Sequence, residues 1–316
     1  MGKRIAKNKK ITSQIIVGIL VIIFLSLVPY IQENGIREKI KQNYSKLTET
    51  SSNIKEESIP VEGELAMHVI DVGQADSILI MQNGTSMLVD CGTKSKGDEV
   101  VQYLKKLGIE KIDILVGTHP HEDHMGGMAK VIRNFEIGVL YTPDTSKENI
   151  TTLWYMDFLE AVQEKNIEWK YPTVGENIEL ENAKIKILGP NSTTYNNINN
   201  YSIAMRISFG ETDILLTGDA EKEAEEEIMK TGFELESEIY KAAHHGSNTS
   251  NSEEFLEKVK PQYVAISVGK DNLYKHPNKN VIKRFDKLGA NIYRTDEVGT
   301  TIFITDGINI NVITSN

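Results

Sequence analysis

The chain has 316 residues, 7 histidines, a single cysteine and a formal net charge of −10. This length allows one large domain with appendages, and a single cysteine excludes both an internal disulfide and a cysteine-based metal site. The acidic balance argues against strong non-specific DNA binding, which needs clustered Lys and Arg. It leaves nuclease chemistry open, because bound metals supply positive charge locally.

The N-terminal residues combine a basic tail with an apolar run. Residues 1–10 carry five Lys or Arg and no acid, and residues 11–31 carry no charged side chain. About 20 apolar residues span a bilayer, so 11–31 is predicted to be a transmembrane signal-anchor, with a cleaved signal peptide as the alternative. The positive-inside rule then predicts a single-pass cell-membrane protein, with residues 1–10 cytoplasmic and the rest of the chain outside the cell.

Residues 32–62 are polar and charged, which predicts a tether, and residues 63–316 are expected to form one domain. Short apolar runs predict strands in this domain at Leu65–Val72, Ser77–Met81, Ser86–Asp90, Ile112–Val116, Gly138–Tyr141, Ile185–Leu188, Ala204–Phe209, Asp213–Leu216, Ile239–Ala243, Tyr263–Val268, Ile292–Arg294, Thr300–Thr305 and Ile308–Ile313. Helical patterns occur at Glu99–Leu107, Met128–Arg133, Leu153–Lys165, Ala220–Lys230, Ser252–Lys258 and Asn280–Leu288. Two halves with strands and then helices predict an α/β fold of two sheets packed face to face, with helices outside.

The most informative motif is His-Pro-His-Glu-Asp-His at 119–124, directly after an apolar strand. Extended backbone places residues i and i+2 on one side, so His119 and His121 can share one metal, while Asp123 and His124 lie past the bend and can serve a neighbouring site. Imidazole and carboxylate suit zinc, and also manganese or iron. The alternative is a set of solvated loop histidines.

Asp219 follows a predicted strand and can bridge two cations from there. The alternative is that it caps the N-terminus of the helix predicted at 220–230, which aspartate also does well.

His244 and His245 follow another strand. Adjacent side chains on an extended chain face opposite ways, so at most one is expected to reach a given metal; His244 is predicted as the ligand. His245 is then predicted to act on the substrate, by hydrogen bonding or by donating a proton. His276, before a proline, is either a substrate-binding or proton-transfer residue or an ordinary loop residue.

Four other polar residues lie on or near the first strands. His68 alternates with apolar neighbours and is expected to pack in the core or behind the metal ligands. Asp71, Asp76 and Asp90 lie at bends or strand ends, where they either support metal-bound histidines or make turns.

These motifs together resemble the metallo-β-lactamase superfamily of binuclear metal hydrolases. The segment 119–124 is similar to the superfamily's H-x-H-x-D-H signature. The closer resemblance is to the C-terminal hydrolase domain of ComEC-type competence DNA-uptake proteins. It covers roughly residues 64–313 and is carried by 68–77, 89–92, 217–221 and 244–247, together with 200–202, 276–277, 295–296 and 299–300.

The resemblance implies a four-layer αββα sandwich that binds two divalent metal ions, zinc first and manganese as the alternative. It implies His119 and His121 on one metal, Asp123 and His124 on the other, and Asp219 between them. Many members supply a further histidine between the signature and the bridging aspartate, but none lies between 124 and 219 here. One metal is then expected to use water, Asn200 or Ser202 instead.

The expected activity is hydrolysis by a metal-bound hydroxide, with Asp123 orienting it and His245 or His276 protonating the leaving group. The substrate is expected to be a small-molecule, cell-envelope or nucleic-acid phosphoester, which makes the protein a phosphodiesterase or nuclease-like enzyme. One alternative is an esterase or lactonase that acts on a cell-envelope component, like the phosphorylcholine esterases. Another is a non-catalytic binding module stabilised by metal.

Overall fold

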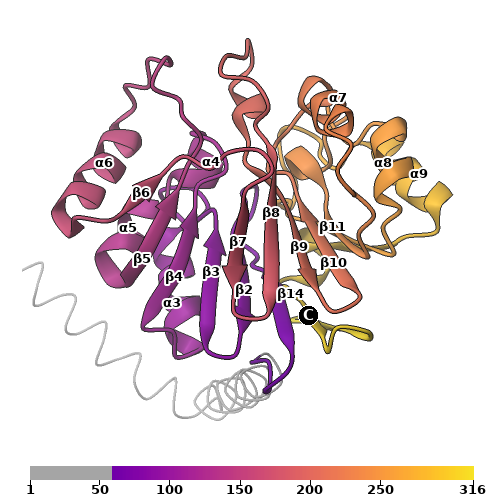
Figure 1. Cartoon of the computed structure of the whole chain (residues 1–316), viewed down its shortest axis with the longest axis horizontal. Coiled ribbons are helices and arrows are strands. Elements are labelled where there is room, and N and C mark those ends of the chain that lie inside the picture. The colour runs from indigo at the N-terminus through magenta and orange to yellow at the C-terminus, as the bar shows by residue number, and fades with distance from the viewer. Residues whose placement is uncertain (1–58) are drawn as a thin grey trace, which may run out of the picture. The chain divides into compact units, whose positions relative to one another are not determined.

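The computed structural model describes residues 59–316, which form two facing β-sheets (Figure 1). Within this range the first sheet has eight strands, in the order β15-β14-β1-β2-β3-β4-β5-β6, and the second has seven, in the order β13-β12-β11-β10-β9-β8-β7. The first-sheet strands are β1 Leu65–Val69, β2 Ile78–Gln82, β3 Thr85–Val89, β4 Lys111–Val116, β5 Glu136–Tyr141, β6 Trp169–Lys170, β14 Thr301–Thr305 and β15 Ile310–Thr314. The second-sheet strands are β7 Asn177–Leu180, β8 Ala183–Gly189, β9 Ala204–Phe209, β10 Thr212–Leu216, β11 Ile239–Lys241, β12 Tyr263–Ile266 and β13 Asn291–Arg294.

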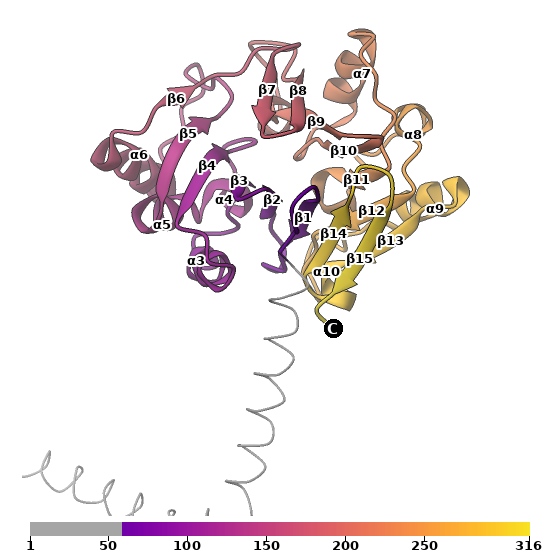
Figure 2. The ribbon, with the colours of Figure 1, turned by 60° about the horizontal axis from the view of Figure 1, so that its bottom comes forward.

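Helices cover the outer face of each sheet, as the two views in Figures 1 and 2 show. The α-helices are α3 Gly97–Lys106, α4 Glu122–Met125, α5 Met128–Asn134, α6 Leu153–Lys165, α7 Lys222–Lys230, α8 Glu253–Val259, α9 Lys279–Leu288 and α10 Thr295–Val298. One apolar cluster joins α3, α5 and α6 to the first sheet, and another joins α7, α8 and α9 to the second. The α/β fold and its four-layer sandwich are therefore confirmed.

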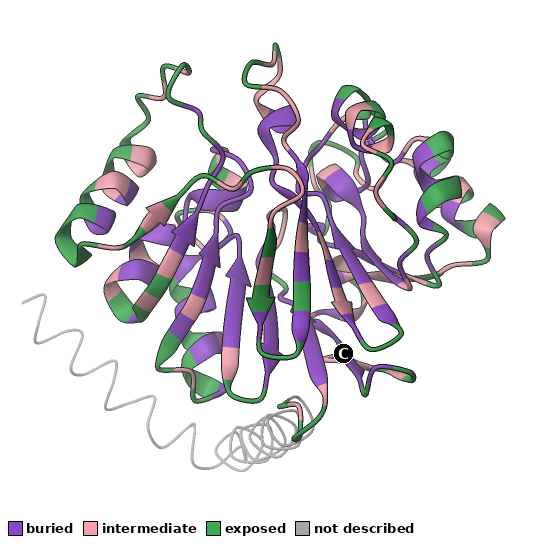
Figure 3. Ribbon diagram, viewed as in Figure 1, coloured by how far each residue is buried: buried purple, intermediate pink, exposed green. Residues whose placement is uncertain are grey.

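The core between the sheets explains why the strands read as continuous apolar runs. In β2, Ile78 and Ile80 face the second sheet, whereas Leu79 and Met81 face the helices. Successive strand side chains point to opposite faces, so a strand covered on both sides must be apolar at every position. Figure 3 shows this burial along the central strands.

The strand directions bring several loops to one edge. β3, β4, β5 and β6 pair in parallel in the first sheet, and β10, β11, β12 and β13 pair in parallel in the second. Parallel strands have their carboxyl ends on the same side, so the loops after β3, β4, β10 and β11 gather together. These are the loops that carry the candidate ligands.

Short elements at the borders were not predicted. β6, β7, α4 and α10 have two to four residues each, which is too short for a hydrophobic period to emerge. His68 lies on β1, fully buried, and its Nδ1 is 2.8 Å from the Tyr103 hydroxyl on α3, so it packs in the core away from the predicted ligands.

The localisation predicted from the sequence needs a correction. No helix within residues 59–316 is long and apolar enough to span a membrane; the longest, α6, has 13 residues, about 20 Å at 1.5 Å per residue against a hydrocarbon core of about 30 Å. The prediction of a single-pass membrane protein is contradicted on this finding. The segment 11–31, together with the predicted tail and most of the tether, lies outside the described residues.

Candidate metal centre

The first pair of candidate ligands comes from the loop after β4. His119 is fully buried, and its Nε2 lies 3.0 Å from Nδ1 of His121. On its other side, Nδ1 of His119 is 3.2 Å from the Thr118 hydroxyl and 3.3 Å from the Ser202 hydroxyl. These contacts hold the ring so that Nε2 and Nδ1 of the two histidines face one space, as their i, i+2 spacing predicts.

A second group forms one helical turn later. His121 has extended backbone and precedes α4, whose first residues present Asp123 and His124. Asp123, His124, Asp219 and His245 each offer a ligand atom, and these atoms all lie within 4.8 Å of one another. The structure thus gathers nitrogen and oxygen donors from three distant parts of the chain.

Asp219 lies between the two groups. Its Oδ1 is 3.2 Å from Nε2 of His124, and its Oδ2 is 4.0 Å from Nε2 of His119. The Ser202 hydroxyl accepts a hydrogen bond from the Asp219 backbone N–H at 3.0 Å. Glu221, not Asp219, occupies the N-cap position of α7, so the helix-capping alternative does not describe this aspartate.

His244 and His245 do not lie on extended chain, so the premise used to choose between them is wrong. β11 ends at Lys241, and the two histidines have φ values of 50° and 53° in a short 3-10 turn. Both rings therefore approach Asp219 Oδ2, with Nε2 of His244 at 3.7 Å and Nε2 of His245 at 3.9 Å. Only His245 belongs to the four-residue group, and its Nε2 is 3.3 Å from Oδ2 of Asp123.

Buried acceptors fix the orientation of two of these rings. Nδ1 of His124 contacts Oδ2 of Asp90 at 2.7 Å, and Nδ1 of His245 contacts the Ser267 carbonyl at 3.0 Å. Each contact leaves Nε2 facing the ligand group. A metal-binding histidine is typically held in this way through its other nitrogen.

Asp76 supports the same region from behind. It is buried, its Oδ1 lies 3.5 Å from Nδ1 of His245, and its Oδ2 accepts a hydrogen bond from the Lys241 ammonium at 2.9 Å. Lys241 is only 1% exposed. Sequence reasoning missed this lysine, although an ionisable residue in the otherwise apolar segment 239–243 is a visible signal.

The other predicted site residues are spread more widely. Asp71 is exposed and accepts from the Gly73 backbone N–H in a turn. Asn200 donates to Glu223 and accepts from the Glu221 N–H, which ties it to the start of α7. Ser202 touches His119 but is not among the grouped ligand atoms.

His276 lines the cavity in front of the ligand group. Its ring stacks on that of His245 at a centroid distance of 6.5 Å and on that of Tyr274 at 5.7 Å. The cavity has a volume of about 460 Å³, and it is lined by Gln74, Thr93, His121, Glu122, Asp123, Asp219, His244, His245, Tyr274 and His276. Tyr274, which is 71% exposed, was not singled out from the sequence.

The electrostatics favour a positive charge inside this group. Burial lowers the pKa of His119 well below its usual range, so this imidazole is neutral and can act as a ligand. Burial would also lower the pKa of His124, but Asp219 and Asp90 raise it well above that range. For His245, Asp219 and Asp76 overcome burial and raise the pKa to about 10.

The donor set fits divalent cations. Within residues 59–316, the buried atoms His124 Nε2 and Asp219 Oδ1 form an ion pair with each other at 3.2 Å but have no well-formed hydrogen bond. A cation between buried carboxylates and imidazoles satisfies such atoms, which would otherwise be costly to bury. Imidazole and carboxylate donors without a thiolate suit zinc and manganese alike, so the structure does not distinguish the predicted metals.

A four-layer αββα sandwich with histidines and aspartates at one sheet edge defines the class of metal-dependent hydrolases to which this chain belongs. The family described as the metallo-beta-lactamase superfamily matches residues 70–270, and the chain is a member of it.

Its curated relatives include competence proteins. The chain is 28% identical over 252 residues to ComE operon protein 3 of Bacillus subtilis (strain 168), a match that covers 74% of this chain and 32% of that protein. It is 30% identical over 244 residues to the competence protein ComA of Neisseria gonorrhoeae, covering 76% of this chain and 32% of that protein. The matched region is about a third of the length of each relative.

Solved structures show the fold. The diiron β-hydroxylase CmlA from Streptomyces venezuelae matches with a TM-score of 0.52 and 15% sequence identity, over 74% of this chain and 53% of that chain. At this identity the likeness concerns the architecture, and the reaction must be inferred from the site.

Proposed function

We propose that this member of the superfamily is a phosphodiesterase that cleaves nucleic acid with two divalent cations. The observation that carries the proposal is the position of Asp219 between two donor sets. One set is His119 with His121, and the other is Asp123 with His124 and His245. One carboxylate shared by two sets of imidazoles is an arrangement suited to two neighbouring cations.

When bound, such cations supply Lewis-acid charge for a phosphoryl oxygen and lower the pKa of a coordinated water. The chain's own residues then orient the reactants. Asp123, on the cavity wall and 3.3 Å from His245, is placed to accept a proton from the attacking water. His276 also lines this wall; burial, His244 and His245 lower its pKa to about 4, so it is a neutral imidazole placed to hydrogen-bond the substrate.

The ligand assignment follows from these positions. We assign His245 to the set of Asp123 and His124 because its Nε2 faces them, and this replaces the predicted proton-donor role. His244, whose Nδ1 contacts the Thr249 hydroxyl at 3.2 Å, is assigned to the substrate side of the centre. Many superfamily members have a further histidine between the signature and the bridging aspartate, and this chain has none there. Water is the simplest donor to take its place at the metal.

Two features support a nucleic-acid substrate. One of the relatives bears the name of a competence protein, and competence concerns DNA. The cavity also carries an exposed aromatic ring at its mouth, Tyr274, and every nucleobase has a face that stacks on such a ring. Because the domain as a whole is acidic, the bound cations and local basic residues must supply the attraction for the phosphates.

A second candidate is an esterase for a choline-like headgroup. The exposed Tyr274 ring beside the cavity favours it, because an aromatic face attracts a quaternary ammonium. The non-catalytic binding module is disfavoured, since structural zinc sites are usually closed and thiolate-rich, whereas this group faces an open cavity.

The test uses metal-loaded protein without an affinity-tag histidine. The substrate panel is bis-p-nitrophenyl phosphate, p-nitrophenyl phosphorylcholine, single-stranded DNA and a lactone. We expect turnover of the first and third, lost in His121→Ala and Asp219→Ala; an exposed variant, Asp71→Asn, is the control. Turnover of the choline ester alone supports the esterase, and bound metal with no turnover supports the binding module.

A further inference from the structure

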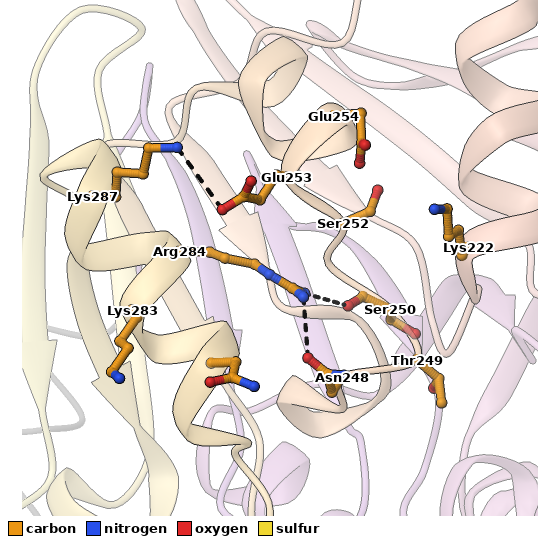
Figure 4. Close-up of a pocket in the computed structure, with 11 residues that line it drawn as sticks. Lys222, Asn248, Thr249, Ser250, Ser252, Glu253, Glu254, Lys283, Arg284 and Lys287 are labelled. Carbon is orange, nitrogen blue, oxygen red and sulfur yellow. Dashed lines mark hydrogen bonds and ion pairs between the residues drawn. The ribbon is translucent and has the colours of Figure 1, made fainter.

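A second cavity lies beside the metal centre, on the helical side of the second sheet. It has a volume of about 550 Å³ and is lined by residues of α7, α8, α9 and the loop before α8, namely Lys222, Asn248, Thr249, Ser250, Ser252, Glu253, Glu254, Asn280, Lys283, Arg284 and Lys287 (Figure 4). Four of these residues are cationic and two are acidic. The domain as a whole has the opposite charge balance, because residues 59–316 carry 25 Lys and Arg against 40 Asp and Glu.

Only part of this positive charge is used by the protein itself. Arg284 reaches from α9 to the loop 248–251, where it donates to the Asn251 carbonyl at 2.9 Å and to the Asn248 side chain at 3.1 Å. Figure 4 shows the contact with Asn248. Lys287 makes a loose ion pair with Glu253 at 3.8 Å. Within the described residues, neither Lys222 nor Lys283 forms an ion pair, and both are exposed.

Neutral donors accompany the cations on the cavity wall. The amide of Asn248 and the hydroxyl of Thr249 line it. Ser250 lines it too, and its Oγ is buried without a hydrogen-bond partner in residues 59–316. The Thr249 hydroxyl gives its one proton to Glu221, so the donors left for phosphate oxygens are the ammonium groups, the Asn248 amide and the Ser250 hydroxyl.

Thr249 connects this cavity to the metal centre. Its hydroxyl lies 3.2 Å from Nδ1 of His244 and donates to Glu221 at 3.0 Å. His244 in turn lines the metal-site cavity. Only the contact between His244 and Thr249 therefore separates the two cavities, so a polymeric substrate bound at the metal centre can extend into the basic cavity. The Tyr274 ring lines the metal-site cavity.

We propose that the basic cavity is a subsite for a backbone phosphate of a single-stranded nucleic acid, next to the phosphate that is cleaved. This inference rests on the proposed function and adds to it a second phosphate-binding site on the same strand. Phosphate subsites together with an aromatic stacking surface favour a nucleic acid over other phosphodiester chains, because only the nucleic acid carries bases to stack.

The experiment compares a short and a long substrate. Lys222→Glu/Lys283→Glu reverses two charges that no other described residue pairs with, and Lys106→Glu/Lys165→Glu makes the same change on α3 and α6 as the matched control. For a 12-nucleotide single strand, KM in the first variant rises about tenfold, and the slope of log affinity against log salt falls by about 1–2. Turnover of bis-p-nitrophenyl phosphate, which has a single phosphate and so needs no second subsite, stays within about twofold.

Other results separate the two proposals. An unchanged KM for the strand, or an equal rise for both substrates, overturns the subsite. If the wild type cleaves neither substrate, the proposed function fails. Fluorescence anisotropy of the labelled strand in EDTA still tests the subsite. Tenfold weaker binding by the Lys222→Glu/Lys283→Glu variant than by the control variant supports the subsite, and equal binding overturns it. Competition by poly(glycerol phosphate) as strong as by DNA with as many phosphates overturns the assignment to nucleic acid.

Discussion

Nδ1 of His124 lies 2.7 Å from Oδ2 of Asp90, and this contact turns Nε2 of the imidazole toward Asp219. Asp90 is itself fixed, because its Oδ1 accepts from the Thr118 N–H at 2.8 Å and its Oδ2 accepts from the Thr118 hydroxyl at 2.7 Å. Asp90, directly after β3, thus orients a candidate ligand on α4.

Asp90→Asn is expected to weaken metal binding about 10–100-fold, because an amide orients the His124 ring less well than a carboxylate does. Zinc and manganese affinities measured by titration against a chelating dye check this. Asp71→Asn, in an exposed turn, serves as the control. Equal affinities in wild type and Asp90→Asn would show that the contact does not position the ligand.

Metal removal is expected to lower thermal stability. The cations bind the folded state, and at 100 times Kd such binding stabilises by about 2.7 kcal/mol, or about 5–10 °C in Tm for a domain of this size. Differential scanning calorimetry with EDTA and after adding metal back measures the shift. In Asp219→Asn the shift should shrink or vanish; a full shift in this variant would place the metals elsewhere.

Lys241→Met is expected to destabilise the fold by about 3–5 kcal/mol, because it leaves the buried carboxylate of Asp76 without its partner. The pair has both side chains 1% exposed. Urea unfolding measures the loss. Lys241→Met combined with Asp76→Leu should lose less than the two single changes added together, and strict additivity would mean that the pair is not coupled.

Gly127→Ala is expected to destabilise by about 1–3 kcal/mol or more through overpacking. A Cβ at this position would lie 2.1 Å from the Cys91 carbonyl oxygen, where the start of α5 crosses the loop after β3. Gly189→Ala, whose Cβ would find no atom nearer than 3.4 Å, is the control. Similar melting temperatures for both variants and wild type would argue against this close approach.

Much of the architecture is readable from local patterns. The helix at 153–165 and the strand at 204–209 have the bounds predicted for them. Most other elements shift by one to three residues, since hydrogen bonds to neighbouring strands decide where pairing stops. The strand predicted through 243 ends at Lys241 instead, because the following residues turn sharply to bring His244 and His245 to Asp219.

The residue types of the centre and their order along the chain were already determined by the sequence. Imidazoles and carboxylates at i, i+2 and at strand ends predict a candidate ligand set by their chemistry alone. Tertiary structure decided which atoms meet. The left-handed conformation of His244 and His245, the burial of Lys241 against Asp76, and the cavity that joins Lys222 to Lys283 depend on packing between segments far apart in sequence. No local pattern encodes such contacts, because they exist only once the two sheets face each other.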